Sequence, residues 1–290
     1  MDHKIIFVAG LGRSGTSVML NLLLHTKGVV SAVNEPLSKY HDVREKGGID
    51  ELEYGNYDVV FNIFNEKFNE IAAGKIDIID DLKKEYVDYI SRDGRYQVIK
   101  EVHKPFVWNR IANIPNVRTI YVIRDVRDVI DSLYKREYSG EIKFLKKEIK
   151  YLKQILRNEK KADQILSNVL NKTPAKVKSI LKLLPNNNWL SKLLAANIVV
   201  KYLQQSSLKY KIPIFNYENY LREERISYIK EMYNELNLTI ENDDFTALEQ
   251  YFEGSQTGYY DVKKDVKKLK NKKRVFLKGY KKKLANFLLW

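Results

Sequence analysis

The sequence predicts an α/β fold, a three-layer sandwich with a central, mainly parallel sheet of about five strands and helical insertions. Short apolar runs rich in β-branched residues alternate with longer segments of helical spacing, a pattern that favours parallel strands joined by right-handed crossovers. The 290 residues are enough for a single domain with a sizeable core. Four of the expected strands are 5–9, 29–33, 119–123 and 212–216.

The helices are expected wherever apolar residues recur three or four positions apart. Residues 142–156, with apolar side chains on one face, show the pattern most clearly. The run Pro185-Asn186-Asn187-Asn188 ends one helix before a largely apolar one begins. The expected helices are 18–24, 50–89, 125–133, 142–156, 160–184 and 190–208. In such folds ligands bind at the carboxyl ends of the strands.

The first strand leads into a glycine-rich loop, residues 10–17, with the sequence Gly-Leu-Gly-Arg-Ser-Gly-Thr-Ser. Glycines allow several backbone N–H groups to face one phosphate, and the following helix adds positive potential. The frame is that of the P-loop, but Thr16 stands where the P-loop has lysine, and Arg13 supplies a cation three positions earlier. This predicts a phosphate site that differs from an ATP site, although an ordinary strand-to-helix turn is the alternative. The residues expected to bind the phosphate are Gly12, Arg13, Ser14, Gly15, Thr16 and Ser17.

A second phosphate site is expected after the strand 119–123. The strand ends at Arg124, Asp125 can cap the next helix, and Ser132 lies two turns along it. A forked guanidinium and a small hydroxyl suit a phosphate, so Arg124 and Ser132 are the candidates. For Asp125 and Arg127 an ion pair at the helix start is the preferred interpretation.

These two motifs resemble those by which sulfotransferases hold PAPS (3′-phosphoadenosine 5′-phosphosulfate). The resemblance implies that residues 10–17 hold the 5′-phosphosulfate and that Arg124 and Ser132 hold the 3′-phosphate. Residues 34–37, Asn-Glu-Pro-Leu, resemble the Glu-Pro-Leu of carbohydrate sulfotransferases that act on N-acetylglucosamine or galactose. A P-loop domain of that family is therefore expected over residues 1–259.

Two weaker matches extend the resemblance to about residue 240. Residues 99–103 resemble the family's third strand, although His103 stands where members often have arginine. Residues 214–221 resemble its Tyr-Glu-Asp-Leu strand end, with Asn219 in place of the aspartate. This match places Tyr217 among the residues expected to bind the cofactor.

The implied reaction transfers a sulfonate group from PAPS to an acceptor hydroxyl on a carbohydrate or glycolipid, without a metal. Arg13 suits the neutralisation of charge on the sulfonate, and Lys100 or Lys104 can contact the bridging oxygen. Glu35 is the expected general base, for which burial or a modest upward pKa shift from about 4.3 would help. His103 is the rival base, because the unperturbed histidine side chain titrates near neutrality.

The net charge of +14 is concentrated in residues 260–290, which contain twelve Lys or Arg and two Asp. Their apolar residues have helical spacing, which predicts a basic amphipathic helix or tail. It can attach to an anionic membrane surface or glycan, or pack on the domain with its lysines in solvent. No specific nucleic acid is expected as a partner.

The chain has no cysteine, no apolar signal segment and no stretch as long as a transmembrane helix. We therefore expect a cytoplasmic protein, with the tail permitting attachment to the inner face of the membrane. Two other functions remain open. One is a P-loop small-molecule kinase that uses ATP and has Asp80 or Asp81 on Mg²⁺; the other is a non-catalytic membrane- or glycan-binding protein.

Overall fold

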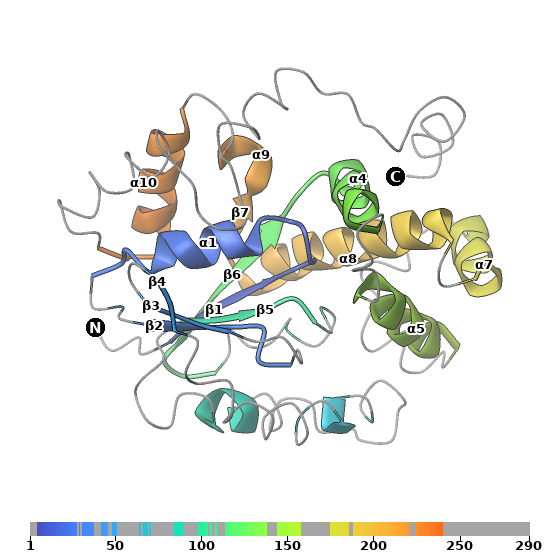
Figure 1. Cartoon of the computed structure of the whole chain (residues 1–290), viewed down its shortest axis with the longest axis horizontal. Helices are drawn as coiled ribbons and strands as arrows, with labels where there is room; N and C mark the ends of the chain where they lie inside the picture. Colours follow the sequence, from blue (N-terminus) through green and yellow to red (C-terminus); the bar gives the residue numbers. More distant parts are fainter. Residues whose placement is uncertain are drawn as a thin grey trace.

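The computed structural model in Figure 1 is an α/β fold in which helices surround a central sheet. It describes residues 5–27, 29, 31–37, 42–45, 48–50, 64, 66–68, 70, 84–89, 98–103, 105, 108, 114–137, 144–157, 175–185, 188–220 and 224–239. The predicted tail, residues 260–290, and the domain boundary before it lie outside this part of the chain.

The described strands form a single sheet. They are β1 (Ile5–Gly10), β2 (Ser31–Asn34), β3 (Asp42–Glu45), β4 (Gly48–Asp50), β5 (Val98–Glu101), β6 (Val117–Ile123) and β7 (Ile214–Asn216). Their order across the sheet is β4-β3-β2-β5-β1-β6-β7. Five neighbouring strands, from β2 to β7 in this order, pair in parallel, which confirms the predicted parallel sheet.

Strands β3 and β4 extend the sheet beyond β2 by antiparallel pairing. They are not among the strands predicted above. They have only four and three residues, and three of the four residues of β3 are charged. A strand of this kind has no apolar alternation, and its pairing with β2 depends on a tertiary contact.

The helices largely match the predicted segments. The labelled ones are α1 (Thr16–Leu23), α4 (Val126–Glu137), α5 (Phe144–Arg157), α7 (Ala175–Leu183), α8 (Trp189–Tyr210), α9 (Tyr217–Tyr220) and α10 (Arg225–Glu235). The prediction over 142–156 is confirmed by α5 and the prediction over 190–208 by α8. Of the predicted 160–184, the structure describes a helix over the second half, α7. In the predicted 50–89, residues 64, 66–68, 70 and 84–89 are helical.

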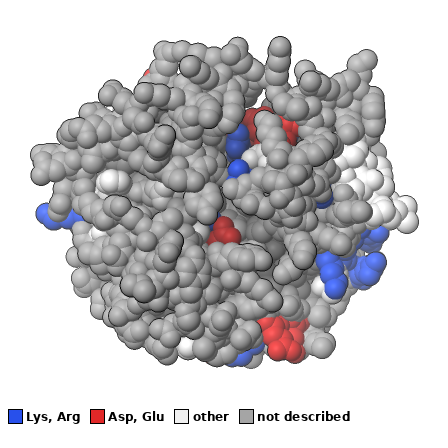
Figure 2. All heavy atoms as spheres, in the orientation of Figure 1, with Lys and Arg blue, Asp and Glu red and all other residues white. Residues whose placement is uncertain are grey.

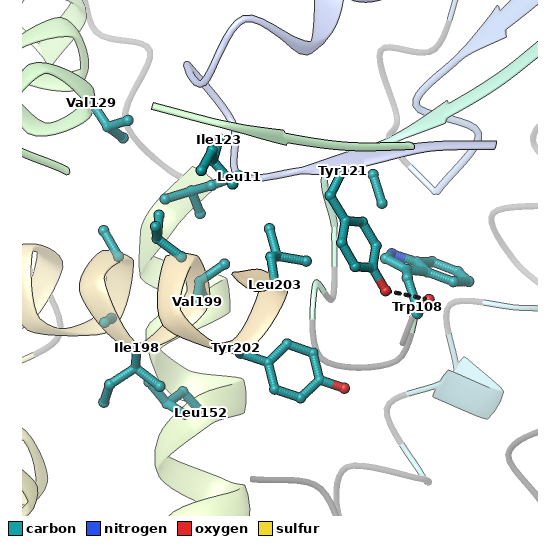
Figure 3. Close-up of a cluster of buried hydrophobic side chains, with 14 of the residues drawn as sticks. Leu11, Trp108, Tyr121, Ile123, Val129, Leu152, Ile198, Val199, Tyr202 and Leu203 are labelled. Carbon is teal, nitrogen blue, oxygen red and sulfur yellow. Dashed lines mark hydrogen bonds between the residues drawn. The ribbon is translucent and has the colours of Figure 1, made fainter. Parts of the chain in front are cut away.

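Apolar clusters cover both faces of the sheet. Because neighbouring residues of a strand point to opposite faces, Phe7 of β1 joins the cluster with α4, α5 and α8, whereas Val8 joins the cluster with α1 and α10. Figure 3 shows part of the first cluster, where Val199 and Leu203 of α8 lie below Ile123 of β6. This packing on two sides fixes the sheet, so the loops at its carboxyl edge start from rigid strand ends.

Within the described residues, no helix is both long enough and apolar enough to cross a membrane.

Candidate functional site

The glycine-rich loop connects the end of β1 to the start of α1 and is held against β6. Ser14 donates its backbone N–H to the Leu11 oxygen (3.0 Å) and its hydroxyl to the Val122 oxygen (3.2 Å). Gly15, the residue before α1, has a φ of 99°, and no side chain caps the helix there. The residue before α1 therefore leaves the first N–H groups of the helix without a side-chain cap, as in the helix N-termini that bind anions.

Tyr217, which follows β7, packs directly against this loop. A Cβ atom at Gly15 would lie 2.3 Å from Cδ2 of the Tyr217 ring, so only glycine fits there. The Arg124 guanidinium lies over the same ring, 4.7 Å from its centroid. Tyr217 itself is only 2% exposed. The structure thus places Tyr217 beneath the loop and beside Arg124.

The two predicted phosphate motifs meet at Arg13. Its Nε donates to Ser132 Oγ of α4 at 3.0 Å, across 119 positions of sequence. Arg124, at the end of β6, donates from Nη1 to the Arg13 backbone oxygen at 3.3 Å. We call Arg13, Arg124, Ser132 and Tyr217 the arginine group. Arg13, Arg124 and Tyr217 follow the carboxyl ends of β1, β6 and β7, and Ser132 comes from α4.

Two carboxylates, those of Glu218 and Asp125, lie beside the arginine group. Glu218 Oε1 accepts a hydrogen bond from the Asp125 backbone N–H at 3.0 Å and lies 4.0 Å from Arg124 Nε. Burial raises the pKa of Glu218, and the hydrogen bond from Asp125 opposes the rise. Arg127 pairs with Asp125, Nη2 to Oδ2 at 2.7 Å, so these two residues form the ion pair predicted at the helix start.

A second set of predicted residues gathers around Lys100 of β5, whose side chain is buried. Its Nζ donates to Asn34 Oδ1 (2.8 Å), to Ser17 Oγ (3.4 Å) and to Glu35 Oε1, with which it forms an ion pair. His103 Nε2 lies 3.7 Å from the other oxygen of Glu35. We call Ser17, Glu35, Lys100 and His103 the lysine group. It follows β2 and β5 and reaches the glycine-rich loop through Ser17.

Glu35 is held in an unusual backbone conformation directly after β2. Its φ is 56°, in the left-handed region that non-glycine residues rarely adopt, and its N–H donates to the Lys100 oxygen at 2.7 Å. Such strain costs on the order of 1–3 kcal/mol and is concentrated at functional sites. The carboxylate is thereby presented at the carboxyl edge of the sheet, between Lys100 and His103.

The electrostatics of Glu35 differ from the upward pKa shift that would favour a base. Burial raises its pKa, but the nearby Lys100 ammonium and His103 outweigh that effect, so the pKa of Glu35 lies well below its usual range. Without a ligand, Glu35 is therefore an ionised carboxylate already paired with a cation.

The candidate site contains polar side chains that were not predicted from the sequence. Asn34 and Glu218 lie inside the motifs described above but have no role predicted from the sequence, and Glu101 follows Lys100 at the end of β5. Two charged residues in succession at the end of an apolar strand were the available signal for Glu101.

Figure 2 shows the described acidic and basic side chains of one face in small groups of both signs.

Among the described residues, no cluster of three His, Asp or Glu side chains is placed to hold a metal ion. Asp80 and Asp81, the candidate Mg²⁺ ligands of a kinase, lie outside those residues. A comparison with models of protein families and a search of curated proteins found no match to this chain.

Proposed function

We propose that this protein is a sulfotransferase with a P-loop three-layer sandwich, which moves a sulfonate group from PAPS to an acceptor hydroxyl. The observation that supports this most strongly is the Arg13–Ser132 hydrogen bond, because it joins two motifs that resemble the two phosphate-binding motifs of that family. The acceptor that we propose is a carbohydrate or glycolipid, on the basis of the Glu-Pro-Leu sequence at residues 35–37.

In this proposal the glycine-rich loop and the arginine group bind different parts of the cofactor. The glycine-rich loop binds the 5′-phosphosulfate through its N–H groups, with Thr16 and Ser17 at the 5′-phosphate. Arg124 and Ser132 bind the 3′-phosphate, and Arg13, whose Nε lies 3.0 Å from Ser132 Oγ, neutralises charge on the sulfonate. Guanidinium groups suit this because their fork matches a phosphate. Tyr217 supports both the loop and Arg124.

The lysine group then performs the transfer. The bond between sulfur and the bridging oxygen to the 5′-phosphate breaks while a bond between sulfur and the acceptor oxygen forms, and the acceptor proton passes to Glu35. Lys100 stabilises the charge that develops on the departing phosphate oxygen. An anion bound near Ser17 competes with Glu35 for the Lys100 ammonium. Losing that cation raises the pKa of Glu35 and makes it a better base.

His103 is the alternative base in the same arrangement. Its Nε2 lies 3.7 Å from Glu35 Oε2, so an acceptor hydroxyl that reaches the Glu35 carboxylate can also reach the His103 ring. Glu35 is preferred because its carboxylate contacts Lys100, which in turn reaches the glycine-rich loop.

Replacing Arg124 by alanine tests the assignment of the 3′-phosphate. We expect PAP (3′-phosphoadenosine 5′-phosphate) to bind about 10- to 100-fold more weakly, as expected from losing charge-assisted hydrogen bonds. Adenosine 5′-phosphosulfate lacks the 3′-phosphate, so its affinity should fall less than about threefold. Calorimetric titration of each ligand gives both values.

The matched control is Arg127→Ala, because Arg127 lies in the same segment but pairs with Asp125. It should leave both affinities close to those of the wild-type protein. If Arg124→Ala weakens the two ligands equally, Arg124 has a structural role and the 3′-phosphate binds elsewhere.

A further inference from the structure

Glu101, the last residue of β5, is a fully buried carboxylate that the proposed transfer does not use. Lys100 and Glu101 are neighbours in the strand, so their side chains point to opposite faces of the sheet. Lys100 contacts Ser17 of α1, whereas Glu101 contacts Tyr86 on the opposite side. Burial of a carboxylate is costly unless its oxygens accept hydrogen bonds, so the partners of Glu101 show what holds it there.

Both oxygens of Glu101 accept hydrogen bonds. Oε1 accepts from the backbone N–H groups of Val102 and His103, each at 2.9 Å. Oε2 accepts from the Leu37 backbone N–H at 3.1 Å and from the Tyr86 hydroxyl at 3.2 Å. One side chain therefore connects the loop after β2, the loop after β5 and the helical segment 84–89.

The two loops that Glu101 connects are the ones that hold Glu35 and His103. Leu37 lies two residues after Glu35, and its N–H is fixed by Glu101. His103 is fixed at both backbone polar groups, since its N–H donates to Glu101 and its oxygen accepts from Trp108 Nε1 at 2.8 Å. Trp108 and Tyr86 pack together, with ring centroids 5.5 Å apart. The hydrogen bonds from Tyr86 to Glu101 and from Trp108 to His103 therefore come from one aromatic cluster.

We propose that Glu101 is a positioning residue that sets the place of Glu35 relative to Lys100 and His103 by tying the two loops together; this rests on the proposed function of Glu35. Three of its four partners are amide N–H groups, which can only donate, so the ionised form fits the geometry. Burial raises the pKa of Glu101, and the nearby His103 opposes the rise. Through its hydrogen bonds to both loops, Glu101 sets the geometry of the site without contacting the substrate.

Replacing Glu101 by glutamine removes the hydrogen bond to Leu37 but keeps the size and shape of the side chain. The amide oxygen can keep the two N–H groups at the Oε1 position, but the NH₂ group then faces the Leu37 N–H, and two donors cannot bond. Glu101→Gln should therefore release Leu37 while leaving the His103 contact in place. Glu101→Asp keeps the charge but is one methylene shorter, so it cannot reach both loops.

The decisive measurement is the titration of the Glu35 carboxyl carbon by NMR in the full-length protein. In the wild type, Lys100 and His103 keep the pKa of Glu35 below its usual range. Glu101→Gln moves Glu35 away from them, so its pKa should rise toward the ordinary value of about 4.3. Removal of a neighbouring negative charge without displacement would instead lower the pKa of Glu35. In Glu101→Gln, a positioning role of Glu101 therefore predicts a higher pKa of Glu35, whereas a purely electrostatic role predicts a lower one.

The matched control is Glu85→Gln, which makes the same chemical change at an exposed residue that pairs with Lys67. It should leave the Glu35 titration and the hydrogen exchange of the Leu37 amide unchanged. Both Glu101 variants should exchange that amide at least about tenfold faster. If the Gln variant does not fold, the same two measurements on the Asp variant decide between the roles.

An unchanged or lowered pKa of Glu35 overturns the proposal, even if Leu37 exchanges faster, because Glu101 would then hold the loop without positioning Glu35. The outcome is independent of the cofactor. Failure of the wild-type protein to bind PAP would remove the proposed function, whereas the titration would still show whether Glu101 fixes the Glu35 loop.

Discussion

Replacing Glu35 by glutamine should lower kcat by about 10²- to 10⁴-fold, which is the usual contribution of general base catalysis. Glutamine keeps the shape and one acceptor oxygen but cannot take the acceptor proton. PAP affinity should remain almost intact, since the change leaves the arginine group untouched and the glutamine oxygen can still accept the hydrogen bond from Lys100. Sulfonate transfer kinetics and PAP calorimetry on the same preparation measure both effects.

The comparison variant is His103→Asn, which should have a smaller effect. His103 Nε2 lies near the Glu35 oxygen that does not contact Lys100, and it is the rival base within the lysine group. If His103→Asn abolishes transfer while Glu35→Gln remains active, and both proteins bind PAP and melt normally, then His103 is the base. The assignment based on the Glu-Pro-Leu resemblance would then be wrong.

Replacing Arg13 by alanine should weaken PAPS binding and lower turnover by about 10²-fold or more, as the loss of a key charge-stabilising donor does. The structure adds a reason, because Arg13 donates to Ser132 and its backbone oxygen accepts from Arg124. The alanine variant keeps the backbone contact, so its loss of activity reports on the guanidinium. Steady-state kinetics with varied PAPS separate the effect on KM from that on kcat.

Arg13→Lys is the informative companion to that variant, because it keeps the positive charge but loses the fork. It should recover only part of the lost PAPS affinity. Near wild-type turnover in Arg13→Ala would remove Arg13 from the site and leave its hydrogen bond to Ser132 as a structural contact.

Much of the fold could be predicted because the five parallel strands and their helices have local patterns. The strand predicted over 119–123 lies within β6, and the helix predicted over 190–208 lies within α8. Strands β3 and β4 were missed because they depend on pairing with β2. Short, charged edge strands of this kind have no pattern of their own.

The candidate site shows the same division. The residues expected to bind at the carboxyl ends of the strands do lie near one another, since Ser132 contacts Arg13 and Lys100 contacts Glu35. Neither of these two contacts was itself predicted. No sequence pattern indicates that Lys100 lowers the pKa of Glu35, because that depends on the direction of a buried side chain. Glu101 was missed for a related reason, since its role depends on backbone N–H groups, which every residue except proline has.

The most direct test of the proposed function is calorimetric titration of the wild-type protein with PAP in the absence of metal, beside a titration with ATP and Mg²⁺. In the proposal PAP occupies two phosphate sites joined by the Arg13–Ser132 hydrogen bond, whereas the loop lacks the lysine that a P-loop uses for ATP. We predict that PAP binds in the absence of metal and that ATP with Mg²⁺ binds at least about tenfold more weakly. Tight binding of ATP with Mg²⁺ and no binding of PAP would contradict the sulfotransferase proposal and favour a kinase.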